Sequence, residues 1–336
     1  MLSDRFCQMP FSFAEIHQGG NVFFCCPTWS GFRSIGNVFR DSSADLWNSL
    51  EAQEIRTGIL DGSFRGCDCA VCPEIVSGNL PPRTKEHDAY GPTLSKGPEK
   101  VKLCHDDTCN LSCPSCRTHM IVANRERQAE LDRMLNEFIV PFLADTSTLW
   151  LSGDGDPFAS KHYRDILRAT ARSNPGMRIN LHTNAVLCDE RAWDDCSLHG
   201  RVDEVDVSID AARPETYAIV RRGGNFERLL KNLEFLGRLR QDGLIKRFEI
   251  AFVVQERNFR EMPEFVKLGQ RLHVDCVGFS VIQHWSRAMD DEEFAMAQVS
   301  RPDHPQYREF LSVLDDPILS EPIVYLGNVS PASRAS

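Results

Sequence analysis

Residues 101–117 read VKLCHDDTCNLSCPSCR, an apolar start followed by Cys109, Cys113 and Cys116 in the spacing C-x3-C-x2-C. The apolar start predicts a strand near 101–104. Three thiols would then lie on one compact loop at the carboxyl end of that strand. Three close thiolates suit a soft metal ion or an iron–sulfur cluster.

Downstream of this loop, extended and helical segments alternate. Repeated strand–helix units imply parallel strands with helices outside them. Six such units can make an open doubly wound sheet or a partial barrel, and in either case functional residues lie at the carboxyl ends of the strands. We expect strands at 101–104, 148–151, 177–182, 204–209, 247–255 and 274–282, and helices at 118–144, 162–172, 189–195, 225–240 and 259–272, with Pro214 opening a further helical stretch.

Composition divides the chain into four parts. Residues 1–75 are turn-rich and cysteine-rich, and residues 76–100 are polar with four prolines, which is typical of a linker. Residues 101–290 hold the alternating units. Residues 291–336 are predicted to form a C-terminal extension packed on them, with a helix near 305–315 and an extended run at 322–326.

The overall composition narrows the class of protein. The net charge of −10 gives no support for nucleic-acid or membrane-surface binding, and no apolar segment is long enough to span a membrane. The first ten residues lack a signal-peptide core, so we expect a cytoplasmic protein. Thirteen cysteines in a cytosolic chain indicate metal binding more often than disulfides. Cys188, Cys196 and Cys276 lie in periodic segments and are expected to be buried apolar residues.

Two kinds of metal centre fit the 109–116 loop. A structural zinc site or an electron-transfer cluster uses four protein ligands, so a zinc loop would need Cys104 or His105 as its fourth ligand. An iron–sulfur cluster held by three cysteines leaves one iron open, and an open iron can bind a substrate directly.

The loop sequence CNLSCPSCR resembles the signature of the radical S-adenosylmethionine superfamily, in the version found in members with an auxiliary-cluster domain called SPASM or, when shortened, twitch. The resemblance implies an α/β protein built on a partial (β/α)6 TIM-like barrel, with a small cysteine-rich α+β domain. It also implies a catalytic 4Fe–4S cluster on Cys109, Cys113 and Cys116, with S-adenosylmethionine bound at its open iron.

Residues that follow the second predicted strand resemble the superfamily's Gly-Gly-Glu segment, whose backbone holds the methionine amino group. They are Ser152, Gly153, Asp154, Gly155, Asp156 and Pro157. Small residues are needed where backbone approaches a ligand closely. Asp156 stands where Glu is more usual, which shortens the reach of that carboxylate. The alternative is an ordinary acidic turn between a strand and a helix.

Further cofactor-side residues are implied at the ends of later strands. Ser208 and Asp210 point to the same side of the fourth strand and match a position that binds the ribose hydroxyls; Asp210 could instead cap the following helix. Asn184 and Gln255 match positions lining the pocket. His284 and Trp285 follow the sixth strand and are substrate-side candidates, or packing residues.

The N-terminal cysteines resemble the SPASM/twitch pattern, in which a hairpin glycine, here Gly20, separates the first two cysteines. The implied ligands of an auxiliary 4Fe–4S cluster are Cys7, Cys25, Cys67 and Cys72, with Cys69 and Cys26 as alternatives to Cys67 and Cys25. The domain precedes the barrel, whereas in many relatives it follows. A small zinc module is the alternative interpretation.

The resemblance implies an enzyme that reductively cleaves S-adenosylmethionine to a 5′-deoxyadenosyl radical and abstracts hydrogen from a substrate. An electron donor of flavodoxin or ferredoxin type is implied as a partner. The substrate is a small molecule, carbohydrate or peptide, and the lack of an evident peptide-recognition domain favours the first two. The alternative is a non-catalytic iron–sulfur or zinc protein for electron transfer or interaction.

Overall fold

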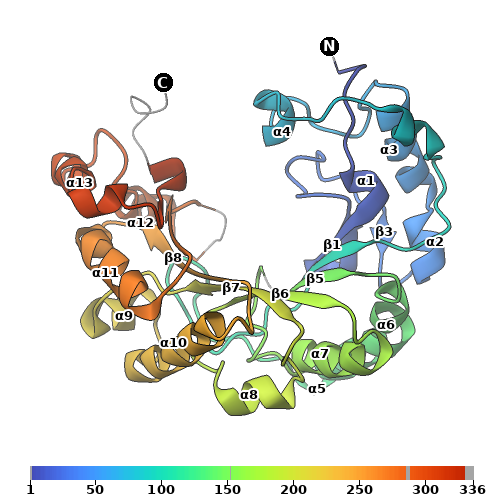
Figure 1. Ribbon diagram of the computed structural model, residues 1–336. Coiled ribbons are helices and arrows are strands. Elements are labelled where there is room, and N and C mark those ends of the chain that lie inside the picture. The colour runs from blue at the N-terminus through green and yellow to red at the C-terminus, as the bar shows by residue number, and fades with distance from the viewer. Residues whose placement is uncertain (1, 152, 285–287, 330–336) are drawn as a thin grey trace. The chain divides into compact units, whose positions relative to one another are not determined.

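The computed structural model describes residues 2–151, 153–284 and 288–329. They form two compact units, and their helices and strands are labelled in Figure 1. The first unit comprises Met1–Asp107, Ala123–Gly155 and Lys161–Ile179, and the second comprises Thr108–Val122, Asp156–Ser160 and Asn180–Ser336. Two positions named above, Ser152 and Trp285, lie outside the described residues. No helix among the described residues is long and apolar enough to cross a membrane.

The N-terminal part of the first unit is built around a β-hairpin. Strands β1 (Phe13–His17) and β2 (Asn21–Phe23) are antiparallel, with Glu15 opposite Phe23. The turn between them uses Gly19 and Gly20 at φ of 74° and 80°. A Cβ on Gly20 would lie 2.5 Å from the ring of Phe39, so this position requires glycine both for its conformation and for space. The predicted hairpin is therefore confirmed. The elements here are α1 (Met9–Ser12), β1 (Phe13–His17), η1 (Gln18–Gly20), β2 (Asn21–Phe23), β3 (Gly36–Asn37), α2 (Ser43–Trp47), α3 (Leu50–Leu60), α4 (Pro73–Val76) and η2 (Lys85–Ala89).

The hairpin continues the sheet of the first unit, which the sequence did not predict. Strand β1 pairs in parallel with β4 (Lys100–Cys104) along its whole length, and β4 pairs in parallel with β5 (Thr148–Leu151). The strand order in this unit is β3-β2-β1-β4-β5. The side chains of Ala14, Ile16, Val101, Leu103 and Leu149 on one face of these strands are fully buried. Burial of that apolar face ties the cysteine-rich segment to the first strand of the repeating units.

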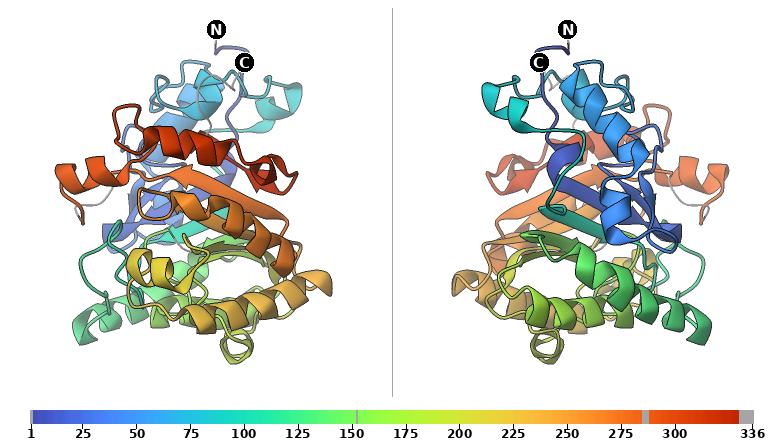
Figure 2. Two further views of the ribbon diagram at one scale, coloured as in Figure 1. Left: turned by 90° about the vertical axis from the view of Figure 1, so that its left-hand side faces the viewer. Right: turned by 90° about the vertical axis from the view of Figure 1, so that its right-hand side faces the viewer.

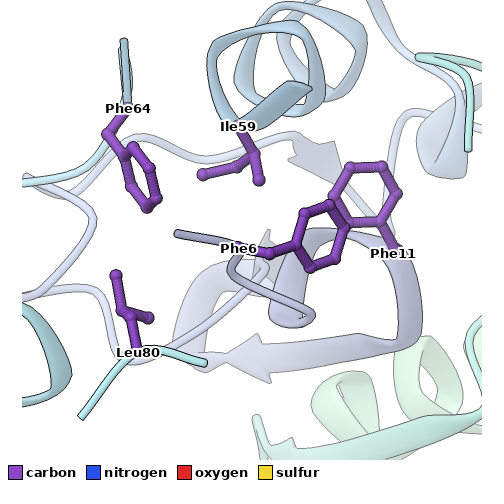
Figure 3. Packing of buried hydrophobic residues seen from close by; sticks show 5 residues of the cluster. All are labelled: Phe6, Phe11, Ile59, Phe64 and Leu80. Carbon is purple, nitrogen blue, oxygen red and sulfur yellow. The ribbon is translucent and has the colours of Figure 1, made fainter. Parts of the chain in front are cut away.

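A small apolar cluster fills the space between α1, α3 and the segment around Leu80. Its buried members are Phe6, Phe11, Ile59, Phe64 and Leu80 (Figure 3), and the rings of Phe6 and Phe11 stack with centroids 5.1 Å apart. Cys7 and Cys67 pack against this cluster. The apolar contacts therefore determine where these two thiols lie.

The long helix predicted at 118–144 begins later than expected. Helix α5 (Arg125–Met134) starts after Asn124, whose side-chain oxygen accepts a hydrogen bond from the backbone N–H of Arg127 at 2.8 Å. An asparagine in this position satisfies a free N–H of the first turn and so marks the start of a helix. A π-helical turn, η3 (Leu135–Ile139), and α6 (Val140–Phe142) follow, and α7 (Lys161–Ser173) lies further along the chain.

The second unit carries the remaining repeats. Strand β6 (Arg178–Thr183) begins in the first unit and ends in the second, where the strand order is β6-β7-β8-β9-β10. Strands β7 to β10 pair in parallel, with β7 at Val202–Ser208, β8 at Arg247–Val254, β9 at Cys276–Val281 and β10 at Val324–Tyr325. The predicted strands are thus confirmed, with ends that shift by one or two residues.

Helices cover the outer face of these strands, as the alternation predicted. Helix α10 packs on β8 and α11 packs on β9 (Figures 1 and 2). Pro214 occupies the first turn of α9, as expected. Cys188 and Cys196 are fully buried, whereas Cys276 is half-buried. The elements are α8 (Glu190–Asp195), α9 (Pro214–Val220), α10 (Phe226–Gln241), η4 (Phe259–Glu261), α11 (Met262–Leu272), α12 (Asp291–Ala297), α13 (Tyr307–Leu314), η5 (Pro317–Ser320) and η6 (Gly327–Val329).

Two buried histidines face each other behind β4 in the first unit. The Nε2 atoms of His105 and His162 are 2.9 Å apart, and both side chains are almost fully buried. One imidazole must donate and the other accept, so both cannot be charged in this arrangement. Burial lowers the pKa of His105 well below its usual value, and burial lowers the pKa of His162 to about 4.

The histidine pair predicts a loss of stability at acidic pH. In the unfolded chain these histidines bind protons as the pH falls below about 6.5, whereas the folded protein does not until a lower pH. Their contribution to stability is therefore present above about pH 6.5 and is lost as the pH falls toward about 4. We expect His162→Gln to flatten this part of the stability profile by on the order of 2 kcal/mol.

Thermal unfolding measured at several pH values between about 7.5 and 4.5 tests this expectation. The exposed His199 provides a control for the substitution itself, since His199→Gln removes no buried contact and should leave stability at about pH 7.5 close to wild type. An unchanged acid profile in His162→Gln would show that the pair does not titrate as described.

Candidate active site

The loop that carries Cys109, Cys113 and Cys116 has little regular structure of its own. One isolated bridge joins Cys109 to Ile121, with the N–H of Cys109 donating to the carbonyl of Ile121 at 2.9 Å. The N–H of Cys116 donates to the carbonyl of Cys113, which closes a tight turn. Most of the restraint on this loop therefore has to come from side chains of neighbouring elements.

Arg222 anchors the middle of the loop. Its backbone carbonyl accepts the N–H of Ser112 at 2.9 Å, and its guanidinium donates to the Ser112 hydroxyl at 3.2 Å and to the Thr118 carbonyl at 3.0 Å. These bonds span both sides of the cysteine turn. Arg222, in the segment after α9, therefore restrains the loop on both sides of its turn.

Asn184, at the end of β6, reaches the same loop. Its amide nitrogen lies 3.0 Å from the side-chain oxygen of Asn110 and 3.7 Å from the sulfur of Cys109. Cys109 and Cys113 are buried, whereas Cys116 is exposed with the Arg117 guanidinium 3.3 Å from its sulfur. The structure thus brings the predicted Asn184 to the predicted cysteines.

A buried ion pair links Cys113 to β7. Arg221, with 13% of its side chain exposed, lies 2.8 Å from Oδ2 of Asp210 and 3.8 Å from the sulfur of Cys113. Burial raises the pKa of Cys113, and the arginine opposes that rise. Burial alone would lower the pKa of Arg221, but Asp210 and Cys113 outweigh it and raise it. The sequence did not predict this role of Arg221. A pair of arginines between a short helix and two glycines gives no sign that one of them is buried.

Both oxygens of the Asp210 carboxylate contact partners within the second unit. Oδ2 faces Arg221, and Oδ1 accepts the N–H of Val253 at 2.7 Å. The backbone of Asp210 has φ of 62°, a left-handed conformation that aspartate tolerates better than most residues. Asp210 therefore acts on the loop through Arg221, in addition to its place at the end of β7.

Two polar atoms beside Cys113 lack a hydrogen-bond partner among the described residues. They are Nε of Arg221 and the hydroxyl of Tyr217, a side chain that is completely buried. A Cβ on Gly224 would lie 2.8 Å from that hydroxyl, so glycine leaves room for it. Unpaired buried donors are costly, which indicates that an acceptor-rich group belongs here. Together with three thiols, they fit an iron–sulfur cluster with bridging sulfides.

Asp156 organises the turn after β5. Its carboxylate accepts hydrogen bonds from the N–H groups of Phe158 and Ala159, from the Thr183 hydroxyl and from the N–H of Asn184, at 2.7–3.2 Å. The side chain is 1% exposed and ties this turn to the end of β6. In the first unit, Asp154 and Gly155 are half-buried, and a Cβ on Gly153 would lie 2.7 Å from the sulfur of Cys104.

The remaining predicted positions lie at strand ends in the second unit. Ser208 is half-buried, with its hydroxyl 3.0 Å from Nε2 of His182. Gln255 lines a cavity of about 490 Å³ beside the cysteine loop, together with Pro114, Arg117, Thr118, Arg222 and Met296. His284 instead packs on Phe294, with ring centroids 4.5 Å apart.

Four N-terminal thiols lie near one another in the first unit. Burial raises the pKa of Cys7 to about 11, with Cys72 adding to the rise. Burial raises the pKa of Cys67 to about 12, with Cys7, Cys69 and Cys72 adding. Burial also raises the pKa of Cys25, with Cys7, Cys67, Cys72 and Cys26 adding. Buried thiols that disfavour one another's ionisation need an added positive charge to become thiolates, which iron would supply.

Cys67 and Cys69 differ in their burial and in their contacts with the other N-terminal residues. The N–H of Cys67 donates to the carbonyl of Phe64 at 3.1 Å, and Cys67 packs against the same apolar cluster as Cys7. Cys69 is exposed, and its sulfur lies 3.9 Å from the Cys67 carbonyl. Among the described residues, no three His, Cys, Asp or Glu side chains converge closely enough for a single metal ion.

Comparisons with protein families identify the class of this chain. Residues 104–269 match the model of the Radical SAM superfamily, and residues 7–73 match the model of the SPASM iron–sulfur cluster-binding domain. Together the two segments take in more than half of the chain. The chain belongs to the radical S-adenosylmethionine superfamily and carries a SPASM domain before its partial (β/α)6 barrel. Its cofactors are therefore 4Fe–4S clusters and S-adenosylmethionine.

Three solved structures that are similar to this chain share little of its sequence. The crystal structure of Streptococcus suis SuiB bound to precursor peptide SuiA is 10% identical, covering 87% of this chain and 65% of that one, with a TM-score of 0.45. Native anSMEcpe with bound AdoMet is 18% identical, covering 65% and 59%, with a TM-score of 0.43. TYW1 with a lysine-pyruvate adduct bound is 15% identical, covering 65% and 74%, with a TM-score of 0.40.

The chain spans about half the length of SuiB in its other two crystal structures, at 49% and 50%. The comparison with curated proteins gave no match.

Arg221 is expected to help retain the catalytic cluster, because a buried cation beside Cys113 offsets the negative charge of a thiolate. Arg221→Gln alone would leave Asp210 buried and unpaired, at a cost of about 3–5 kcal/mol. The variant that combines Arg221→Gln with Asp210→Asn removes both charges together. We expect it to fold but to lose iron several-fold faster than wild type when challenged with a chelator under anaerobic conditions.

The matched control combines Arg213→Gln with Glu264→Gln, which removes an exposed ion pair of the second unit. It should release iron at a rate closer to wild type. Equal retention of iron by the double variant and the wild type would contradict the role given to Arg221.

The surroundings of Cys67 and Cys69 predict different effects on iron content. Cys67→Ala should lower the iron from about eight to about four atoms per chain, as expected for loss of one of two 4Fe–4S clusters. Cys69→Ala, at an exposed position, should keep about eight. Iron and acid-labile sulfide counting on anaerobically reconstituted protein measures both, and the reverse result would exchange the two assignments.

Proposed function

We propose that this protein is a radical enzyme that abstracts hydrogen from an unactivated carbon of its substrate after reductive cleavage of S-adenosylmethionine. Cys109, Cys113 and Cys116 would hold the catalytic cluster. When bound, that cluster supplies one electron to the sulfonium, which releases methionine and a 5′-deoxyadenosyl radical. The observation that carries the proposal is the loop itself: three thiols, two of them buried, beside Arg221 and two unpaired buried donors.

Several further residues would orient the cofactor and exclude water. Gly153, Asp154 and Gly155 would receive the methionine moiety along their backbone, since small residues allow close approach. Asp156 supports this role indirectly, because all its hydrogen bonds hold the turn and the end of β6. Asn184 would hold Cys109, Asp210 would hold Arg221, and Ser208 would face the nucleoside.

The cavity beside the cysteine loop is large enough to hold one small-molecule ligand. Its volume of about 490 Å³ lies within the range of small-molecule sites. Three arginines and several acidic side chains line it, including Arg117, Arg222 and Glu256. A polar substrate matches that lining better than an apolar one. We propose a polar small molecule or carbohydrate, with a peptide as the alternative.

The N-terminal cysteines would hold an auxiliary 4Fe–4S cluster on Cys7, Cys25, Cys67 and Cys72. Four thiolates leave that cluster closed, so electron relay, acceptance of the substrate's electron or support of the substrate are its possible roles. Under this proposal residues 1–75 are the auxiliary domain, 76–100 the linker, 101–290 the barrel and 291–336 an extension. A flavodoxin or ferredoxin would supply electrons, in the cytoplasm.

Loss of any catalytic thiol should abolish cleavage of S-adenosylmethionine. Cys109→Ala, Cys113→Ala and Cys116→Ala each remove one of only three thiolates proposed to hold the cluster. We expect formation of 5′-deoxyadenosine to fall to background while the N-terminal site keeps about four irons. Anaerobic reconstitution, iron counting and a chromatographic assay for 5′-deoxyadenosine with dithionite test this.

Cys104→Ala is the matched control, because Cys104 is a thiol close to the loop in sequence whose sulfur donates to Glu15 in the first unit. It should retain cleavage. Full activity in any of the three loop variants, or a protein that binds zinc and no iron, would favour the non-catalytic alternative.

A further inference from the structure

A chain of three hydrogen-bonding side chains joins β6 to β7 in the second unit. The hydroxyl oxygen of Ser208 lies 3.0 Å from Nε2 of His182, and Nδ1 of the same imidazole lies 2.8 Å from Oδ2 of Asp206. Asp206 and Ser208 alternate with Val205 and Val207, which are fully buried. The three polar side chains therefore share the face of the strands opposite the apolar core.

This arrangement determines which way the Ser208 hydroxyl points. A carboxylate accepts hydrogen bonds, so Nδ1 of His182 carries the proton and its N–H donates to Asp206. Nε2 then carries a lone pair and accepts the hydroxyl proton of Ser208. With its proton directed at His182, the oxygen of Ser208 presents its remaining lone pairs to a ligand. Ser208 is thereby prepared as an acceptor for a donor group.

At this end of β7, Ser208 is more open to a ligand than Asp210. Asp210, the other residue predicted to face the nucleoside, is 2% exposed, and its two oxygens already contact Arg221 and the N–H of Val253. Ser208 is half-buried at the carboxyl end of its strand, where ligands of parallel β/α proteins bind. A ribose hydroxyl is a donor that matches an acceptor oxygen.

We propose that His182 and Asp206 are positioning residues that make Ser208 a hydrogen-bond acceptor for a ribose hydroxyl of S-adenosylmethionine. This inference rests on the proposed function, in which the end of β7 faces the nucleoside. It gives the pocket a means of selecting the hydroxylated sugar over a deoxy one, because the acceptor is left unpaired when the hydroxyl is missing.

The same three residue types form the relay of serine hydrolases, but the surroundings differ here. An oxyanion hole commonly uses the N–H of the residue after the nucleophile. The N–H of Ile209, which follows Ser208, donates to the carbonyl of Ala251 at 3.0 Å. That group is occupied by the sheet, so the geometry favours a binding role for Ser208.

The test measures the affinity of cluster-loaded protein for S-adenosylmethionine and for its 2′-deoxy and 3′-deoxy analogues, by anaerobic equilibrium dialysis. In the wild type, at least one analogue should bind about 10-fold more weakly than the parent, as expected for one lost hydrogen bond. His182→Leu removes the acceptor for the Ser208 proton. It should weaken the parent by about 5- to 10-fold and reduce the discrimination against that analogue toward unity.

His182→Gln keeps a carbonyl that can accept the Ser208 proton, so it should restore affinity for the parent to within about 3-fold of wild type, with discrimination. His199→Gln, at the exposed His199–Asp194 pair, is the control and should behave as wild type. A His182→Leu variant that binds like wild type, or that weakens the parent and both analogues equally, would overturn the inference. A wild-type protein that binds no S-adenosylmethionine would instead overturn the proposed function.

Discussion

The ion pair between Arg221 and Asp210 is the interaction on which the candidate site depends. A loop that carries three thiols has few backbone hydrogen bonds of its own, so its shape must come from groups outside it. Arg221 provides this by contacting Cys113 with one nitrogen and the end of β7 with another. A buried arginine needs a carboxylate partner to offset its desolvation. Asp210 is that partner, and the sheet fixes Asp210 in turn through the N–H of Val253.

The cysteines of the 109–116 loop and the N-terminal cysteines differ in how the charge of a buried thiolate is offset. At the 109–116 loop, Arg221 and Arg117 bring positive charge to within 4 Å of the sulfurs of Cys113 and Cys116. At the N-terminal site, the thiols raise one another's pKa and pack against an apolar cluster. A closed cluster supplies its own iron charge to four thiolates, whereas a site with an open iron also has to admit a charged cofactor. The arginines beside the loop offset the negative charge of its thiolates.

Acidic residues near the site act mainly by holding other groups. Asp156 supports a turn and Asp210 supports an arginine, while Asp206 supports a histidine. In each case the carboxylate accepts hydrogen bonds inside the second unit. Among the described residues, groups that can meet a ligand include backbone groups, the Ser208 hydroxyl and the donors beside Cys113. Rigid support of this kind is what keeps reactive groups in productive geometry.

The sequence by itself determined the alternation of strands and helices, the cysteine loop after the first repeat and the hairpin at Gly20, because periodicity and close spacing are local properties of the chain. Asn124 also marks where α5 begins, a local signal that was overlooked. Only the tertiary structure decided that β1 pairs with β4, that Arg221 is buried against Cys113 and that His182 bridges Ser208 and Asp206. These facts join residues that are distant in sequence. Burial and ion pairing depend on which segments meet in space, and the local sequence around each residue does not specify those contacts.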